Sequence, residues 1–343
     1  MKRFLCYLRR FGIFLMITLA ILIAGAYSVM WILVNGPSEL AKELFVLSVR
    51  ETSAGGFLAD IYCTDDEIKE IEEKNKVQMT DEITDTSIVT IEKNENSEDD
   101  SENNENSDGE VFVDGVRFEV VKGSTFVGMM MIVEDPSRVF VGSLDTYGEG
   151  IGLTVPQFID KYDVIGAVNA GGFEDNAGDG SGAIPIGPVV SEGQVKWGNL
   201  NSTYEIIGMT EDDILVVGNM TLQKALDMGV RDAVSFGPIL VVNGQSTEMG
   251  GTGGGLNPRT AIGQRSDGAI LLLVIDGRQA SSLGANMRDV TNVMLEFGAV
   301  NAANLDGGSS TSMFYDGECL NSSASLKGMR YLPNTILVRR LEE

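Results

Sequence analysis

The architecture of this chain follows from one segment, Asn304-Leu305-Asp306-Gly307-Gly308-Ser309-Ser310-Thr311-Ser312. Its paired glycines let the backbone turn sharply after a strand and expose N–H groups to a ligand. Asp306 follows an apolar segment and precedes glycine, which places its carboxylate at a strand end, facing a cleft. Three more glycine-rich segments interrupt apolar runs in this way: Val168-Asn169-Ala170-Gly171-Gly172-Phe173-Glu174-Asp175, Gly255-Leu256-Asn257-Pro258-Arg259-Thr260-Ala261-Ile262-Gly263 and Val274-Ile275-Asp276-Gly277-Arg278. Each alone is equally typical of a plain turn.

Short β-branched or apolar runs surround these segments and are typical of strands, because Gly, Pro, Asp or Asn bound each one. The best strand candidates are residues 129–133, 138–142, 164–168, 214–217, 239–242 and 269–275. Helices are sparser: the clearest is 286–297, which starts at a capping Asn286 and ends before Gly298, and shorter ones are 154–162 and 221–228. Strands do not alternate with long helices, so the pattern favours an α+β domain with a mixed or antiparallel sheet and few helices over residues 111–343.

The composition removes several classes of function. The chain has 343 residues, 50 acidic and 25 basic, with a formal net charge of −25, and it contains no histidine. Without histidine there is no Ser-His-Asp or Cys-His pair and no HExxH zinc site. Nucleic acid is excluded as a partner, since phosphate backbones are bound by basic surfaces. Chemistry therefore has to rest on carboxylates, arginine, hydroxyls, amides or a hard metal ion.

A membrane segment is predicted at residues 11–34, which contain no charge and would form a helix about 36 Å long, enough to cross a hydrocarbon core. Residues 1–10 are basic, so we expect a cytoplasmic tail, a signal-anchor and an extracellular remainder. The competing interpretation is a cleaved signal peptide, because residues 24–26 read Ala-Gly-Ala. We favour the single-pass anchor in the cell membrane because the apolar run continues beyond that point. Both interpretations export the rest of the chain.

Two segments separate this helix from the strands. Residues 35–80 show helical spacing of apolar residues, broken at Gly55-Gly56, and predict a juxtamembrane helical stalk. A stalk, an interfacial helix, a dimer contact and a solvated spacer remain open alternatives. Residues 81–110 predict a disordered acidic linker, because 92–110 are almost entirely Glu, Asp, Asn and Ser and cannot bury a core.

Taken together, the glycine-rich segments resemble the phosphodiester glycosidase family over about residues 120–343. The resemblance rests on the order of Asn-Pro-Arg-Thr-Ala-Ile-Gly, Asp-Gly-Arg and Asn-Leu-Asp-Gly-Gly-Ser-Ser, with Ser235-Phe236-Gly237-Pro238 and Arg330-Tyr331-Leu332-Pro333-Asn334 in addition. The first motif departs from the family's Asn-Gly-Gly-Phe-Phe and reads Asn169-Ala170-Gly171-Gly172-Phe173. The anchor and acidic linker are similar to those of exported bacterial members associated with exopolysaccharide. The resemblance implies a hydrolase that cleaves sugar phosphodiesters.

The residue chemistry agrees with that implication. Cleavage at an anomeric carbon requires a carboxylate for the oxocarbenium-like centre and groups that hold the anionic phosphate. Arg259 and Arg278 suit the phosphate because guanidinium binds its oxygens as a bidentate fork, although a structural salt bridge is the alternative for each. Asp306 is the first candidate for nucleophile or general base. Asp276 is either its partner carboxylate or a turn-capping residue, and Glu174 is a further catalytic candidate.

The remaining polar residues of the motifs are candidates for substrate contacts, with local capping of the backbone as the alternative. They are Asn169, Gly171, Gly172, Asn257, Thr260, Asn304, Gly307, Gly308, Ser309 and Ser310. No cofactor is required by this chemistry. Asp175 and Asp179 are the candidates for a calcium or magnesium site, but the residues around them do not fit an EF-hand.

These observations predict a membrane-anchored extracellular hydrolase that cleaves a glycosyl-phosphate linkage in a cell-surface polysaccharide or glycan. The alternative is a non-catalytic carbohydrate-binding or exopolysaccharide assembly protein that uses the same cleft. A third alternative is an interaction module that works through residues 38–76. The expected partners are the glycosyl-phosphate or polysaccharide and the membrane, and the sequence does not define an oligomeric state.

Overall fold

The computed structural model describes residues 2–52, 55–91, 114–175, 180–325 and 328–341. Its α-helices are α1 (Lys2–Asn35), α2 (Glu39–Arg50), α3 (Phe57–Asp60), α4 (Asp65–Lys74), α5 (Val155–Tyr162), α6 (Leu222–Asp227) and α7 (Met287–Glu296). Three of them, α5, α6 and α7, belong to the strand-rich part of the chain and coincide within one or two residues with the predicted helices.

The strands form three sheets, and every pairing between described strands is antiparallel. The seven-stranded sheet contains, in spatial order, β1 (Val116–Lys122), β2 (Val127–Val133), β13 (Ile270–Ile275), β12 (Arg259–Arg265), β14 (Ala299–Leu305), β10 (Ile239–Val242) and β11 (Gln245–Ser246). One five-stranded sheet contains β16 (Glu318–Cys319), β15 (Met313–Tyr315), β4 (Gly166–Asn169), β17 (Asn334–Val338) and β3 (Val139–Ser143). The other contains β6 (Gln194–Trp197), β5 (Val189–Ser191), β9 (Val230–Ser235), β7 (Thr203–Thr210) and β8 (Leu215–Thr221). The predicted α+β class is confirmed.

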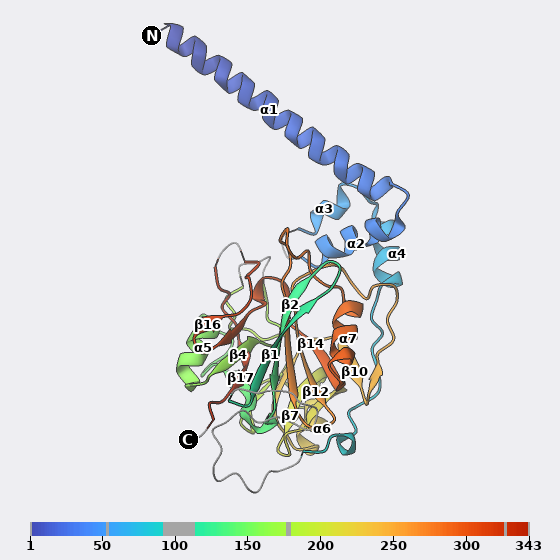
Figure 1. Ribbon diagram of the computed structural model, residues 1–343, viewed down its shortest axis with the longest axis vertical. Helices are drawn as coiled ribbons and strands as arrows, with labels where there is room; N and C mark the ends of the chain where they lie inside the picture. Colours follow the sequence, from blue (N-terminus) through green and yellow to red (C-terminus); the bar gives the residue numbers. More distant parts are fainter. Residues whose placement is uncertain (1, 53–54, 92–113, 176–179, 326–327, 342–343) are drawn as a thin grey trace.

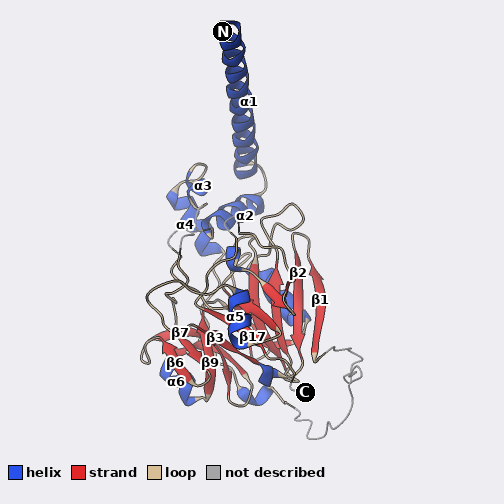
Figure 2. Ribbon diagram, turned by 90° about the vertical axis from the view of Figure 1, so that its left-hand side faces the viewer, coloured by secondary structure: helices blue, strands red, loops and turns tan. Residues whose placement is uncertain are grey.

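The main core lies between the seven-stranded sheet and the other two sheets. Strand β13 shows why: its sequence ILLLVI is apolar at every position, and all six residues are buried. Leu272 and Val274 face the core shared by the three sheets, whereas Leu271 and Leu273 face α7. A strand that is covered on both faces has no solvent side and therefore shows no polar alternation. The seven-stranded sheet is thus a central layer (Figures 1 and 2).

Each sheet has a helix on its outer face. Val290 and Met294 of α7 pack on the seven-stranded sheet, Phe158 of α5 packs on the sheet of β4 and β17, and Leu222 of α6 packs on the sheet of β7 and β8. Helix α7 begins where the sequence predicts, because the Asn286 side chain accepts from Asp289 N while the Asp289 side chain accepts from Asn286 N. This reciprocal capping satisfies two otherwise unpaired donors of the first turn.

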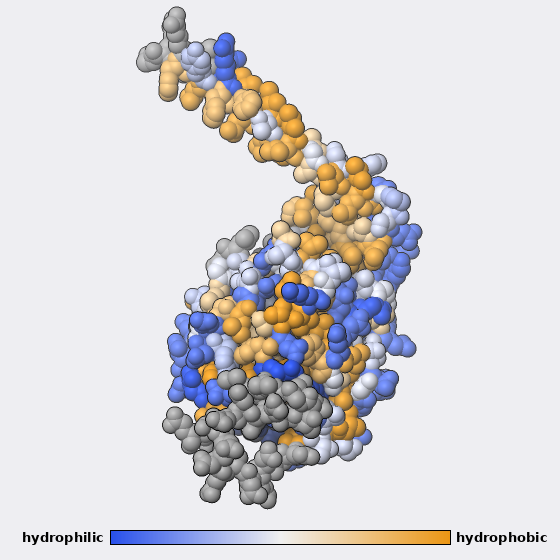
Figure 3. Space-filling view, viewed as in Figure 1, coloured by the Kyte–Doolittle hydropathy of each residue, from blue (hydrophilic) through white to orange (hydrophobic). Residues whose placement is uncertain are grey.

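The N-terminal helix carries the apolar segment predicted to span a membrane. Residues Tyr7–Asn35 are long and apolar enough to cross one, and the helix extends away from the strand layers with no part of its apolar window buried inside the chain (Figures 1 and 3). Its last turn is different, because Val34 is buried against α2 and α4 together with Val46, Ile68 and Ile71. Helix α1 is therefore joined to the helices that follow it.

The predicted stalk region does form helices, and they lie over one end of the strand layers (Figure 2). Its solvated-spacer interpretation is wrong, because Ser48 of α2 and Glu51, which follows α2, make hydrogen bonds to the glycine-rich segment at 255–257. The stretch from 75 to 91 then runs along the domain: Val77 pairs with Met249, Ile83 pairs with Gly218, and Thr90 N donates to Ser266 O. Residues 81–91 were expected in the disordered linker, yet Thr84 and Val89 are buried. The sequence was misleading here because the segment buries only a few isolated side chains among acidic ones. The rest of the expected linker, 92–110, lies outside the described residues.

Candidate active site

A cavity of about 390 Å³ opens beneath α2, at the end of the strand layers where all four glycine-rich segments meet. It contains three arginines and three carboxylates, and its lining residues are Glu51, Phe173, Asp175, Phe236, Asn257, Arg259, Arg278, Met287, Asp306, Gly307, Gly308, Ser309, Ser310 and Arg330. A slightly larger hollow of about 440 Å³ beside α7 is lined by none of the predicted site residues. We therefore place the candidate active site in the first cavity.

Asp306 occupies the end of β14, where the chain leaves the sheet and enters a short 3-10 turn at Gly308–Ser310. Its backbone is fixed on both sides: its N donates to Ala170 O at 2.8 Å, and its O accepts from Asn169 Nδ2 at 2.5 Å. Burial raises the pKa of Asp306 to about 6, while a hydrogen bond from Ser310 and the charge of Arg330 oppose the rise. A carboxyl with such a pKa can exchange a proton near neutral pH.

Behind Asp306, two of the predicted substrate-binding residues form a buried support. The Asn169 Oδ1 accepts from Thr260 Oγ1 at 2.8 Å and from Ser312 N at 3.0 Å, so both lone pairs of the amide oxygen accept hydrogen bonds. Neither Asn169 nor Thr260 has any exposed surface. They join three motifs, at 169, 260 and 304–312, and thereby set the position of the Asp306 loop.

Arg278 is the arginine of the cavity that forms no ion pair among the described residues. Its Nη2 donates to Asn257 Oδ1 at 2.9 Å and to Thr52 Oγ1 at 3.3 Å. Its backbone has φ 58°, a left-handed conformation that is strained for a residue with a side chain and is common at functional sites. Burial and the neighbouring Arg259 lower the pKa of Arg278, and Glu51 opposes this. Arg278 remains exposed to solvent and has no carboxylate partner among the described residues, so its guanidinium is available to an anion.

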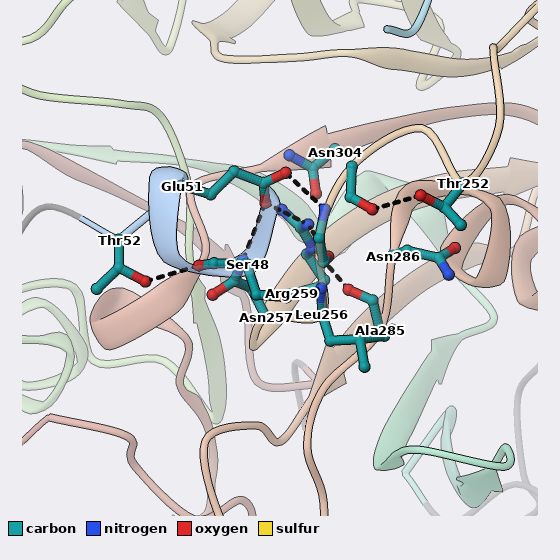
Figure 4. Close-up of polar contacts among 12 residues, drawn as sticks. Ser48, Glu51, Thr52, Thr252, Leu256, Asn257, Arg259, Ala285, Asn286 and Asn304 are labelled. Atoms are coloured by element: carbon teal, nitrogen blue, oxygen red, sulfur yellow. Dashed lines mark hydrogen bonds and ion pairs between the residues drawn. The ribbon is translucent and has the colours of Figure 1, made fainter. Parts of the chain in front are cut away.

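Arg259, by contrast, is already paired, and its partner is Glu51, the residue that follows α2. Its Nη2 lies 2.6 Å from Glu51 Oε2 and 2.7 Å from Gly255 O, and its Nε donates to Ala285 O at 3.0 Å. Glu51 also accepts from Gly255 N at 2.7 Å and from Asn257 Nδ2 at 3.0 Å (Figure 4). The salt-bridge alternative for Arg259 is therefore observed, although with a glutamate outside the glycine-rich motifs.

A second ion pair closes the opposite part of the lining. Arg330 pairs with Asp175, donates to Ser309 Oγ at 2.9 Å and lies over the Phe173 ring, 5.2 Å from its centroid. The pair brings the first motif and the segment at 330–334 together beside Asp306. The Asp175 carboxylate, which was a candidate metal ligand, is thus paired with the Arg330 guanidinium.

Several predicted site residues lie outside the cavity lining. Asp276 accepts from Ser322 N at 2.9 Å and from Asn321 Nδ2 at 3.3 Å, so it holds the loop at 321–322, and burial raises its pKa. Glu174 is exposed. Asn304 is buried and donates to Gly237 O at 2.7 Å.

The two glycines of the first motif serve close packing. A Cβ at Gly172 would meet Phe236 at 2.6 Å, and Gly171 N donates to the Asn334 side chain. The predicted residues that do line the cavity are Asp306, Arg259, Arg278, Asn257, Gly307, Gly308, Ser309, Ser310 and Asp175.

The described residues bear on the predicted calcium or magnesium site at Asp175 and Asp179. Among them no group of three His, Cys, Asp or Glu side chains is close enough to hold an ion. Asp179 lies outside the described residues, and Asp175 is engaged with Arg330.

Sequence reasoning missed Glu51, Arg330 and Phe236 as site residues. Arg330 and Phe236 stood in segments noted for their similarity to the family, so the signal existed but lacked a chemical reason. No sequence signal marked Glu51 as a site residue, because it is one of many glutamates in an amphipathic helical region. Only the packing of α2 over the segment at 255–257 places it in the cavity.

Comparison with known proteins shows the family to which the chain belongs. Residues 162–339, more than half of the chain, match the sequence model of the phosphodiester glycosidase family. The SPbeta prophage-derived uncharacterized protein YomE of Bacillus subtilis (strain 168) is 29% identical over 203 residues, which cover 55% of this chain and 29% of that protein. Human N-acetylglucosamine-1-phosphodiester alpha-N-acetylglucosaminidase is 28% identical over 182 residues, which cover 48% of this chain and 34% of that protein. The match thus spans about a third of the length of these relatives.

A solved structure supports the fold. The zebrafish N-acetylglucosamine-1-phosphodiester alpha-N-acetylglucosaminidase catalytic domain, auto-inhibited by pro-peptide, superimposes with a TM-score of 0.56 at 19% sequence identity. The superposition covers 66% of this chain and 83% of that chain.

Proposed function

Because the chain belongs to the phosphodiester glycosidase family, we propose that it is a hydrolase acting on phosphodiester-linked glycans. In finer terms, it cleaves a glycosyl-phosphate linkage in a cell-surface polysaccharide or glycan. One observation carries the proposal: a carboxyl with a pKa of about 6, Asp306, lines the same cavity as Arg278, an arginine without an ion pair in the described chain. A sugar phosphodiester needs both groups.

The division of labour follows from the chemistry of the bond. Arg278, with Ser309 of the turn at Gly308–Ser310, holds the phosphate oxygens and stabilises the charge that develops as the C1–O bond breaks. The electron pair of that bond remains on the phosphate oxygen. The departing phosphate monoester is a stable anion, so it leaves without a carboxylic acid to protonate it.

Asp306 serves the anomeric carbon. As a carboxylate it either attacks C1, forming a glycosyl ester that water then hydrolyses, or removes a proton from the water that attacks C1. In both routes the hydroxyl of water ends on the sugar. Its position at the end of β14 is held by Asn169 and Ala170, which fixes the carboxylate relative to the phosphate-binding turn. Asp276, which lies away from the cavity, has no step in this mechanism.

The cellular setting is proposed from α1. Its charge-free stretch at residues 11–34 follows basic residues, which supports a single-pass anchor with the N-terminus in the cytoplasm and the strand-rich domain outside. Helices α2–α4 would then lie between the bilayer and the active site. This arrangement favours substrates at the cell surface.

Hydrolysis by the full chain in detergent tests the function. We expect release of free sugar from an α-N-acetylglucosaminyl methyl phosphate or another member of a panel of glycosyl methyl phosphates. Asp306→Asn should remove the activity while thermal unfolding stays within a few degrees of wild type. Arg278→Gln should raise KM by about tenfold or more, because it removes the unpaired cation. Absence of release from every panel member, with saturable glycan binding, would support the non-catalytic alternative instead.

A further inference from the structure

The cavity contains a carboxylate, that of Glu51, to which the proposed mechanism gives no role. This residue comes from the juxtamembrane helical segment and not from the strand-rich domain. Glu51 follows the last residue of α2, outside the family match at 162–339 and outside the three sheets. Its side chain is 32% exposed and lines the cavity, whereas its partner Arg259 is only 9% exposed. The carboxylate thus forms part of the wall that a ligand contacts.

Glu51 is not needed to hold Arg259 in place. The guanidinium already donates from Nε to Ala285 O and from Nη2 to Gly255 O, two backbone acceptors on the domain itself. The effect of Glu51 is instead electrostatic. With Glu51 present, three arginines face three carboxylates, and without it the lining has an excess positive charge.

This balance matters because phosphate esters differ in charge. A phosphodiester carries one negative charge, whereas a phosphomonoester carries about −1.5 to −2 near neutral pH. Repulsion by Glu51 grows in proportion to the charge of the ligand, so the monoester is penalised about twice as strongly as the diester. For charges roughly 6 Å apart in a partly solvated pocket, the difference amounts to about tenfold in affinity.

We propose that Glu51 is a specificity-determining residue that selects phosphodiesters against phosphomonoesters by neutralising Arg259. The inference rests on the proposed function, because it assigns the ligand to the same cavity. It also explains why a juxtamembrane helix is in contact with the site: α2 supplies the charge that lets the phosphomonoester product leave. Glu51 therefore acts on release of product as well as on choice of substrate.

The test compares two probes that differ by one methyl group, methyl phosphate as the dianion and dimethyl phosphate as the monoanion. Binding of each to the full chain is measured by calorimetry at pH 8, for wild type, Glu51→Gln and Glu51→Ala. We expect the ratio of the two dissociation constants to shift by about tenfold toward methyl phosphate in both variants. The ratio is measured within one preparation, so a partly unfolded sample does not alter it.

Glu39→Gln is the matched control, since Glu39 is exposed in the first turn of the same helix and its replacement changes the net charge equally. Its ratio should equal that of wild type. An unchanged ratio in both Glu51 variants would overturn the proposal. If both probes bound more tightly by the same factor, the proposal would be overturned, because Glu51 would then only block the cavity. If both bound more weakly by the same factor, Glu51 would act by positioning Arg259, which would also overturn it.

Hydrolysis assays separate this inference from the proposed function. A shifted ratio in a protein that hydrolyses no panel member would preserve the charge selection and reject the enzyme. Hydrolysis of diesters with an unchanged ratio would preserve the enzyme and reject the role of Glu51. Failure of wild type to bind either probe would reject the role of Glu51, and failure to hydrolyse any panel member as well would reject both.

Discussion

At the scale of single residues, the site is organised by which charges are paired. Arg259 and Arg330 each have a carboxylate partner, whereas neither Arg278 nor Asp306 forms an ion pair within the described part of the chain. The sequence predicted Asp306, Arg259 and Arg278 from their place beside glycines. Pairing depends on Glu51 and Asp175 arriving from distant segments, and nothing in the local sequence encodes that.

The pKa of Asp306 gives a prediction for the pH dependence of activity. The active form is the carboxylate, and its pKa is raised to about 6, so kcat/KM should fall about tenfold per pH unit below pH 6 and level off above it. Arg330 lowers the pKa of Asp306, so Arg330→Gln should move the midpoint to higher pH. Steady-state kinetics from pH 4.5 to about 9 would measure both. A midpoint that moves downward in Arg330→Gln, or activity that rises below pH 6, would contradict the role of Asp306.

At the scale of secondary structure, helices and strands were predicted correctly where neighbouring residues determine the local conformation. Helix α7 begins at its Asn286 cap and the apolar run of β13 is a buried strand, as expected. The order of strands within sheets was not predicted, because β13 pairs with β2 and β12 pairs with β14 through partners that are far apart in sequence. Residues 38–76 were predicted as helical, but their docking was missed because it depends on polar contacts of Ser48 and Glu51 rather than on an apolar pattern.

The cap of α7 offers a prediction at this scale. Asn286→Ala removes the side-chain acceptor for Asp289 N and should lower the free energy of unfolding by about 1 kcal/mol. Asn292→Ala is the control, because Asn292 is exposed in the same helix and alanine favours helix there. Urea unfolding monitored by circular dichroism would compare them. Equal stability of the two variants would show that the cap contributes nothing.

At the scale of the whole molecule, the segment between the membrane helix and the sheets is part of the domain. Thr84 illustrates this: its hydroxyl accepts from Val217 N at 2.9 Å and lies 3.2 Å from Asn301 Oδ1, and the residue is buried. The acidic composition of this segment suggested a linker, because composition averages over residues and does not reveal one buried hydrogen-bonding side chain.

Replacement of Thr84 tests that attachment. Thr84→Val leaves the buried Val217 N without an acceptor and should destabilise the strand-rich domain by about 1–3 kcal/mol. Thr86→Val, at an exposed position two residues later, should change stability by less than about 0.5 kcal/mol. Thermal unfolding of the full chain provides the comparison. If both variants unfold like wild type, residues 81–91 behave as a spacer in solution.

The central claim is that this chain breaks the bond between sugar carbon and phosphate oxygen. Hydrolysis of a glycosyl methyl phosphate in water enriched with ¹⁸O, followed by mass spectrometry of both products, tests it most directly. We predict that the label enters the released sugar at C1 and that methyl phosphate carries none. Label in the phosphate product would mean that water attacks phosphorus, and it would contradict the glycosidase mechanism and the role of Asp306.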